Sequence, residues 1–107
     1  MTNIYDLEVP STGELFSTLL SREDISIKHI VSSDSIPDTL YIQDEDEWVL
    51  LLEGRAVLDV DGERIALGRG EHLYIPALTP HRVLETDMDT RWLAIFITPT
   101  QTSTPQP

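Results

Sequence analysis

The chain of 107 residues contains no cysteine, so disulfide bonds and thiolate metal sites are excluded. Basic residues are few: 7 Lys and Arg stand against 19 Asp and Glu, which gives a formal charge of −12. A surface of this charge repels phosphate groups, so neither nucleic acid nor an anionic membrane is an expected partner. No apolar run approaches the ~20 residues that span a bilayer, and no basic start precedes an apolar stretch. We therefore expect a cytoplasmic protein of one domain.

The two ends of the chain differ from its middle. Residues 1–24 contain the one helix signal, a capping-box pattern at Ser11-Thr12-Gly13-Glu14 followed by an apolar stripe. The stripe consists of Leu15, Phe16, Leu19 and Leu20. We expect a short helix over about 12–20 that lays this stripe on the body of the protein. The tail, 98–107, is rich in Pro and Thr and is predicted to be disordered because it has almost nothing to bury.

The body, residues 25–97, consists of short β-rich runs separated by turn residues. The runs cover 25–31, 39–43, 48–52, 55–60, 63–67, 71–75, 81–85 and 91–97. Many short strands without interleaved helices predict an all-β sandwich or barrel.

One hairpin has a predicted register. Asp61-Gly62 separates the runs 55–60 and 63–67, and this dipeptide is a strong signal for a two-residue turn. The turn pairs Leu58 with Ile65, Ala56 with Leu67 and Asp59 with Arg64. Apolar pairs then share one face and opposite charges share the other, which supports the hairpin.

Two runs, 48–52 and 91–97, are apolar on both faces. An antiparallel strand of this kind needs cover on both faces. The predicted helix can supply part of the cover and a second subunit the rest. We therefore expect a homodimer that buries part of Trp48 and Trp92 or their neighbours.

A cluster of polar residues stands between the second and third runs. If the acidic residues 44–46 form a hairpin loop, Gln43 and Glu47 become a cross-strand pair, and Tyr41 points to the same face. Glu47 also shares its face with Val49 and Leu51. A carboxylate that starts a core-facing row must be paired, hydrogen-bonded or bound to a metal.

These residues belong to two motifs that resemble those of the cupins. Tyr41-x-Gln43, three residues, Glu47, six residues and Gly54 resembles the first motif, which is His-x-His, three or four residues, Glu, six residues, Gly. The stretch from Gly70 through Pro76 to His81 resembles the second motif, which is Gly, five residues, Pro-x-Gly, two residues, His, three residues, Asn. The resemblance covers about 37–97. It implies a double-stranded β-helix, or jelly-roll barrel, that commonly holds one divalent metal through the motif histidines and glutamate.

The chain departs from the motifs at several positions. Tyr41 and Gln43 replace the first-motif histidines, Leu78 replaces the second-motif glycine, and Glu85 stands in place of the asparagine. The metal ligands that the resemblance implies are therefore Gln43, Glu47 and His81, for Zn, Mn, Ni or Fe. The alternative is a metal-free hydrogen-bonded cluster of these residues with Tyr41.

Two other histidines receive different interpretations. His29 ends a period-two row with Ile25 and Ile27 that could bring it to the mouth of the pocket, although a structural role is the stronger expectation. His72 is expected on the surface, because Leu73 and Ile75 take the opposite face. Tyr41 and His29 are thus secondary pocket candidates.

Two classes of function follow for a protein whose partner is a small molecule. The first is a metal-dependent enzyme that acts on a small polar molecule. The second is a noncatalytic ligand-binding or sensing module. The missing histidines favour the second class modestly, because a facial triad of two histidines and one carboxylate cannot be assembled from these motifs.

Overall fold

The computed structural model describes residues 3–99, which form eight strands and one short 3-10 turn. The elements are η1 (Ile4–Asp6), β1 (Glu14–Ser21), β2 (Ile25–Ser32), β3 (Asp46–Glu53), β4 (Ala56–Val60), β5 (Glu63–Leu67), β6 (His72–Ile75), β7 (His81–Thr86) and β8 (Thr90–Ile97). Residues 100–107, most of the predicted disordered tail, lie outside the described residues. Within residues 3–99 no helix is long and apolar enough to cross a membrane.

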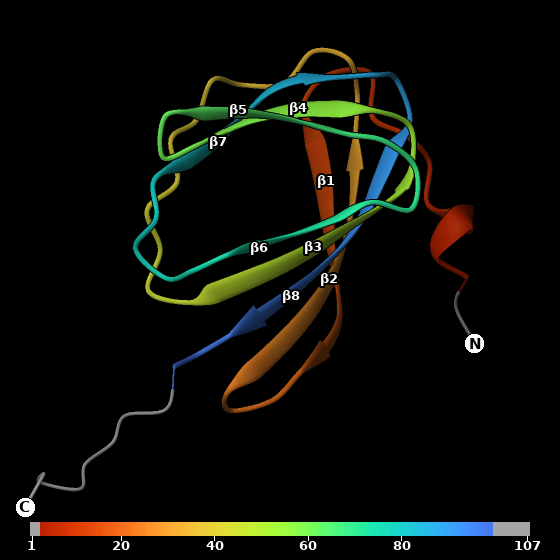
Figure 1. Ribbon diagram of the computed structural model, residues 1–107. Coiled ribbons are helices and arrows are strands. Elements are labelled where there is room, and N and C mark those ends of the chain that lie inside the picture. Colours follow the sequence, from red (N-terminus) through yellow and green to blue (C-terminus); the bar gives the residue numbers. More distant parts are fainter. Residues whose placement is uncertain (1–2, 100–107) are drawn as a thin grey trace, which may run out of the picture.

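The strands form two antiparallel sheets that face each other (Figure 1). The larger sheet has the order β1-β2-β8-β3-β6, and the smaller sheet has the order β5-β4-β7. β1 and β2 are consecutive in sequence, but the central strand β8 pairs with two strands that are far from it in sequence, β2 and β3. This topology confirms the predicted all-β jelly-roll barrel.

The predicted helix over 12–20 is wrong, because Glu14–Ser21 form strand β1. Glu14 pairs with Ser32 and Phe16 with Ile30 along the edge of the larger sheet. The register shifts between Thr18 and Leu20, so β1 contains a bulge that changes the alternation of its faces. Apolar residues at 15, 16, 19 and 20 suit a helix, but they also suit a bulged strand whose backbone hydrogen bonds are supplied by β2. The one helical segment of the described chain is the single turn η1.

The predicted strand over 39–43 is also wrong. This segment runs as a connection outside the sheets, and only Tyr41 forms a bridge, through two backbone hydrogen bonds with His81 of 2.8 and 3.0 Å. Residues 44–46 are therefore not a hairpin loop. Asp46 begins β3, and its carboxylate accepts a hydrogen bond from the Ala77 amide at 2.8 Å.

The predicted hairpin of β4 and β5 is confirmed. All three expected pairs, which are Leu58–Ile65, Ala56–Leu67 and Asp59–Arg64, occur in the register of the two strands. Asp61 and Gly62 both have positive φ, 52° and 88°, as a type I′ turn requires. The local turn thus fixes which side chains of β4 face the other sheet.

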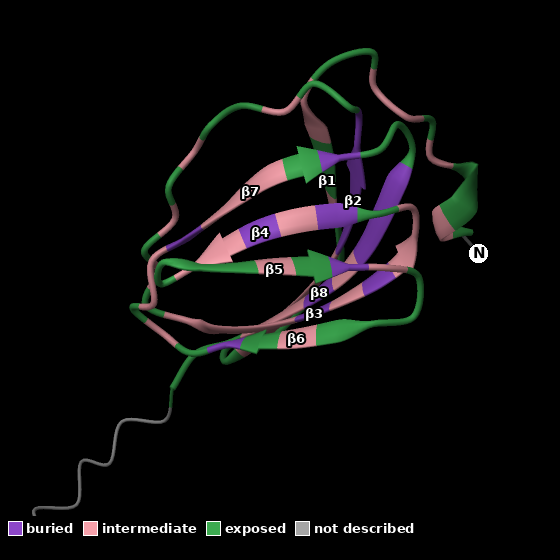
Figure 2. Cartoon of the chain, turned by 45° about the horizontal axis from the view of Figure 1, so that its top comes forward, coloured by how far each residue is buried: buried purple, intermediate pink, exposed green. Residues whose placement is uncertain are grey.

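The core lies between the sheets (Figure 2). Its buried members include Val49 and Leu51 of β3, Leu58 of β4, and Trp92 and Ala94 of β8. Trp92 is only 3% exposed, so it cannot take part in a subunit interface, contrary to one form of the dimer prediction. Because side chains alternate along a strand, Trp48 takes the opposite, outer face of the larger sheet.

The segment before β1 is attached to the end of β8 by one arginine. Arg91 is 6% exposed, and its guanidinium donates hydrogen bonds to the carbonyls of Ile4 at 3.0 Å and Leu7 at 2.7 Å. It also pairs with Asp89 at 2.9 Å. These bonds hold residues 4–7 against β8, although β8 lies at the other end of the sequence.

Candidate functional site

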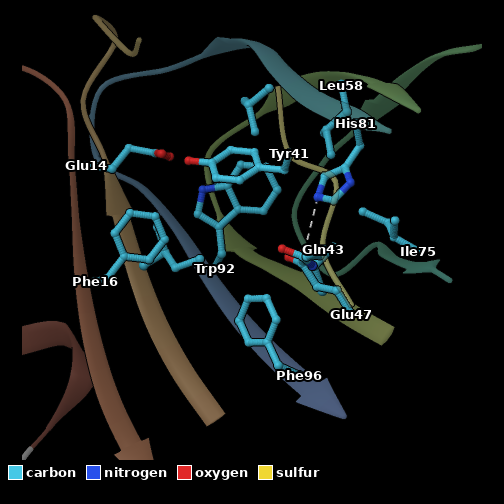
Figure 3. A pocket seen from close by; sticks show the side chains of 13 residues that line it. Glu14, Phe16, Tyr41, Gln43, Glu47, Leu58, Ile75, His81, Trp92 and Phe96 are labelled. Atoms are coloured by element: carbon cyan, nitrogen blue, oxygen red, sulfur yellow. Dashed lines mark hydrogen bonds and ion pairs between the residues drawn. The ribbon is translucent and has the colours of Figure 1, made fainter. Parts of the chain in front are cut away.

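A pocket of about 70 Å³ opens between the two sheets. Five polar residues line it: Glu14, Tyr41, Gln43, Glu47 and His81. The rest of the lining is apolar and consists of Phe16, Ile30, Val49, Leu58, Ile75, Val83, Trp92 and Phe96. The polar groups project into this apolar space from β1, β3, β7 and the connection before β3 (Figure 3).

Three of the predicted site residues meet at one carboxylate oxygen. The amide Nε2 of Gln43 donates to Oε1 of Glu47 at 2.9 Å, and Nε2 of His81 lies 3.3 Å from the same atom. The side chains of His81 and Glu47 are 6% and 12% exposed, so the pair is largely removed from water. The alternation of β3 brings this about, because it turns Glu47 to the same side as Val49 and Leu51. Gln43 and Glu47 are in contact as expected, although not as a cross-strand pair.

The ring of His81 is held from both sides. Its Nδ1 lies 2.9 Å from the carbonyl oxygen of Thr79, which can only accept, so Nδ1 carries a proton and Nε2 faces Glu47. Burial lowers the pKa of His81, but the hydrogen bond to Glu47, the bond to Thr79 and the charge of Glu47 together outweigh burial and raise the pKa above its usual value. The protonated imidazole is thus the favoured partner of the Glu47 carboxylate.

Tyr41 forms one wall beside this pair. Its ring stacks on that of His81 with centres 5.7 Å apart and an interplanar angle of 26°. Burial and the charges of Glu14 and Glu47 raise the pKa of the Tyr41 phenol, so it stays neutral. A neutral phenol is a poor metal ligand, but it offers a hydrogen bond to a bound molecule.

Glu14 is a pocket residue that the sequence reasoning assigned to a helix cap. Its carboxylate accepts a hydrogen bond from the Ser32 hydroxyl at 2.5 Å, and that hydroxyl accepts from the indole Nε1 of Trp92 at 2.9 Å. Burial raises the pKa of Glu14, and the bond from Ser32 reduces this effect. In Figure 3 the carboxylate points toward the hydroxyl of Tyr41, across the pocket from Glu47. If this segment is taken as a strand, side-chain alternation puts Glu14 and Phe16 on the same face, and this signal predicts Glu14 as a pocket residue.

The remaining two histidines lie outside the pocket. His29 is 1% exposed but takes the face of β2 opposite to Ile30, and it does not line the cavity, so its placement at the pocket mouth is wrong. Its Nε2 has no hydrogen-bond partner among residues 3–99, and burial followed by the charge of Arg91 lowers its pKa. His72 is exposed, as predicted, and its ring lies 5.6 Å from that of Trp48.

The donors at Glu47 do not make up a set that holds a divalent metal tightly. Structural and catalytic metal sites in proteins commonly use three or more imidazole, carboxylate or thiolate ligands. Among residues 3–99 no three His, Asp or Glu side chains gather in this way. Glu47 and His81 are suitable ligand types, but the third group, Gln43, is a neutral amide and presents its nitrogen to Glu47.

Comparison with known proteins identifies the family. The cupin domain family matches residues 36–96. Quercetin 2,3-dioxygenase of Bacillus subtilis is 37% identical over 71 residues, which are 66% of this chain, but the chain spans only 19% of the dioxygenase. A Ralstonia eutropha protein that carries the provisional name mannose-6-phosphate isomerase is 32% identical, with a TM-score of 0.83 over 92% of this chain and 98% of that one. A Desulfitobacterium hafniense cupin superfamily protein shares the fold at 21% identity, with a TM-score of 0.81 over 90% and 87% of the two chains. The chain therefore belongs to the cupin family.

Proposed function

We propose that this cupin binds a small polar molecule in the pocket between its sheets, without a resident metal. The observation that carries the proposal is the Glu47–His81 pair, which lies in a cavity lined mostly by apolar side chains, with both side chains at most 12% exposed. Buried polar groups are costly unless they are paired, and here the pair still presents hydrogen-bonding capacity to the cavity. An apolar pocket with a few converging polar groups is the usual form of a small-molecule site.

In this proposal each polar residue has a binding role. Glu47 orients the ligand by accepting hydrogen bonds, whereas the two ring nitrogens of His81 face Glu47 and the Thr79 carbonyl, so His81 holds the Glu47 carboxylate in position. Gln43 keeps the Glu47 carboxylate in place through its 2.9 Å bond. Tyr41 covers His81 and offers a neutral hydroxyl. Such a site serves a noncatalytic binding or sensing module, and the same groups would also serve an enzyme whose chemistry needs only proton transfer.

A weakly held divalent metal is the second candidate. It is favoured by the convergence of Gln43, Glu47 and His81 on one point. To act as ligands, Gln43 would have to turn its amide oxygen toward the ion, and His81 would have to present an unprotonated Nε2. Zn, Mn, Ni or Fe held in this way would exchange readily, since only two of the three groups are strong ligands.

Two measurements test the proposal. Metal analysis of untagged protein purified without chelator should find far less than one Zn, Mn, Ni or Fe per chain. A stoichiometric metal that is lost in Glu47→Gln but retained in the outer-face control His72→Ala would overturn the metal-free proposal. A screen of small polar molecules, read by NMR shifts of the Trp92 indole, should give ligands whose binding is weakened by Glu47→Gln and by His81→Ala. A screen in which every ligand binds these variants as well as the parent would place the binding site elsewhere.

We also propose that the protein is a homodimer that uses the outer face of the larger sheet. Trp48, Leu50, Leu93 and Ile95 pair across β3 and β8 on that face. In a chain of charge −12, an uncharged face is where a second copy meets least repulsion. Light scattering should give twice the 12.1 kDa chain mass, and Trp48→Glu should give the single chain. A wild-type protein of 12.1 kDa at micromolar concentration would contradict the dimer. The expected cytoplasmic location stays a prediction.

A further inference from the structure

The aromatic side chains of the pocket surround a space that has a carboxylate at each end. Phe16, Tyr41, Trp92 and Phe96 line it from β1, β8 and the connection before β3. Figure 3 shows the carboxylate of Glu14 on one side of these rings and that of Glu47 on the other. Aromatic faces carry a negative potential, so rings and carboxylates attract the same kind of group.

The charges of the lining are not balanced from within. His81 compensates Glu47 at 3.3 Å, but the bond of Glu14 is to the neutral hydroxyl of Ser32. Among residues 3–99, no lysine or arginine lines the pocket, and no salt bridge involves Glu14. A half-buried carboxylate without a cation is costly, and a positively charged ligand would offset that cost.

An ammonium group already lies against one of these rings. Nζ of Lys28, on β2, is 5.1 Å from the centre of the Phe96 ring, which is within the range of a cation–π contact. Lys28 itself is not part of the lining. This contact is independent of the carboxylates, and it indicates that Phe96 accepts an ammonium group in this environment.

We propose that the ligand of this pocket is a small organic ammonium ion, held between the Glu14 carboxylate and the aromatic rings of Phe16, Tyr41, Trp92 and Phe96. This inference rests on the proposed function, because it names the chemical class of the molecule that the pocket binds. The charge of −12 on the chain favours the approach of such a cation. The rival is an anionic ligand that reaches the pocket mouth and pairs with Lys28.

Three probes of nearly equal shape separate these possibilities. The first is choline, and the second is neohexanol, in which carbon replaces the ammonium nitrogen. The third is tert-butylacetate, the carboxylate anion of 3,3-dimethylbutanoic acid. Binding is measured by calorimetry and by tryptophan fluorescence in the full-length Trp48→Phe variant, in which Trp92 is the only tryptophan left. Choline should bind about tenfold more tightly than neohexanol, and tert-butylacetate should bind more weakly than either.

Variants locate the site. Glu14→Gln keeps an acceptor for Ser32 but removes the charge, so choline should bind about fivefold more weakly or worse while neohexanol is little affected. Glu63→Gln is the matched control, since it removes the same charge from an exposed position on β5. Phe96→Leu, the second variant, should weaken choline several-fold, which keeps the test decisive if Glu14→Gln folds poorly.

The outcomes are distinct. Two results would overturn the cation inference and leave the pocket function standing. In the first, neohexanol binds as tightly as choline. In the second, tert-butylacetate binds more tightly than choline and loses affinity in Lys28→Met. Equal losses in Glu14→Gln and Glu63→Gln would overturn the role of Glu14. If none of the three probes binds, the cation inference fails, whereas the proposed function is judged separately by its own ligand screen.

Discussion

Replacement of Gly54 by alanine should destabilise the barrel more than any comparable change at a turn. Gly54 joins β3 to β4 with φ of +93°, and a Cβ added there would lie 2.5 Å from Oγ1 and 2.9 Å from Cα of Thr90. Thr90 cannot easily move, because it is fully buried and its hydroxyl donates to the Asp87 carbonyl at 2.7 Å. The turn between β3 and β4 therefore lies so close to the start of β8 that any side chain at position 54 would collide with Thr90.

The magnitude has two parts. A left-handed backbone costs an L-residue about 1–2 kcal/mol, and overpacking a buried site costs a further ~1–3 kcal/mol. The sum for Gly54→Ala is about 2–5 kcal/mol. Gly62→Ala is the matched control, because Gly62 has φ of +88° but no atom within 4 Å of the added Cβ. Its cost should be limited to the backbone part, about 1–2 kcal/mol.

Urea unfolding of the two variants and the parent measures this difference. The unfolding midpoint should fall for both variants and fall further for Gly54→Ala, with similar slopes. Equal losses of unfolding free energy would mean that Thr90 does not crowd Gly54, and the close approach of β8 to this turn would be refuted. A control variant without any loss would refute the type I′ turn at Asp61-Gly62.

Three further changes test the site and its surroundings. Ser32→Ala should cost about 1–3 kcal/mol in urea unfolding, because the buried indole N–H of Trp92 loses its acceptor; an unchanged midpoint would mean that the N–H finds another partner. Leu78→Gly should stabilise the protein by up to about 1 kcal/mol, since Leu78 is 63% exposed at φ 65°, and a loss would show that its side chain packs in solution. Since the folded-state pKa of His81 is raised, its stabilising effect is complete below its unfolded pKa of 6.5 and is lost as pH rises through the folded value. Unfolding free energies at about pH 6 and pH 9 should therefore differ more in the parent than in Glu47→Gln, and identical differences would contradict the Glu47–His81 pairing.

Features that depend on neighbours in sequence were predictable. The β4–β5 hairpin follows from Asp61-Gly62, because a two-residue turn allows few backbone conformations and sets the register of both strands. The contact of Glu47 with His81 followed from the spacing of two motifs that resemble those of cupins, and the fold they implied is the one observed. Turn chemistry is a local property, so the sequence contains it in full, whereas the contact of Glu47 with His81 was predictable only through the resemblance to cupins.

The roles of β1 and of the segment before β3 were decided only by tertiary contacts. Residues 14–21 have a pattern that suits a helix or a bulged strand, and their pairing with β2 selects the strand. That choice carries Glu14 from a supposed helix cap into the pocket. Tyr41 likewise approaches His81 through a single bridge, not through a strand.

The sequence by itself determined an acidic, cysteine-free, all-β chain with one defined hairpin and with Glu47 and His81 as candidate site residues. The order of strands in the larger sheet decided the rest. It determined which face of β8 carries its tryptophan into the core and which carboxylates share a pocket. Backbone hydrogen bonds between strands distant in sequence set that order, and no local pattern records which strands will meet.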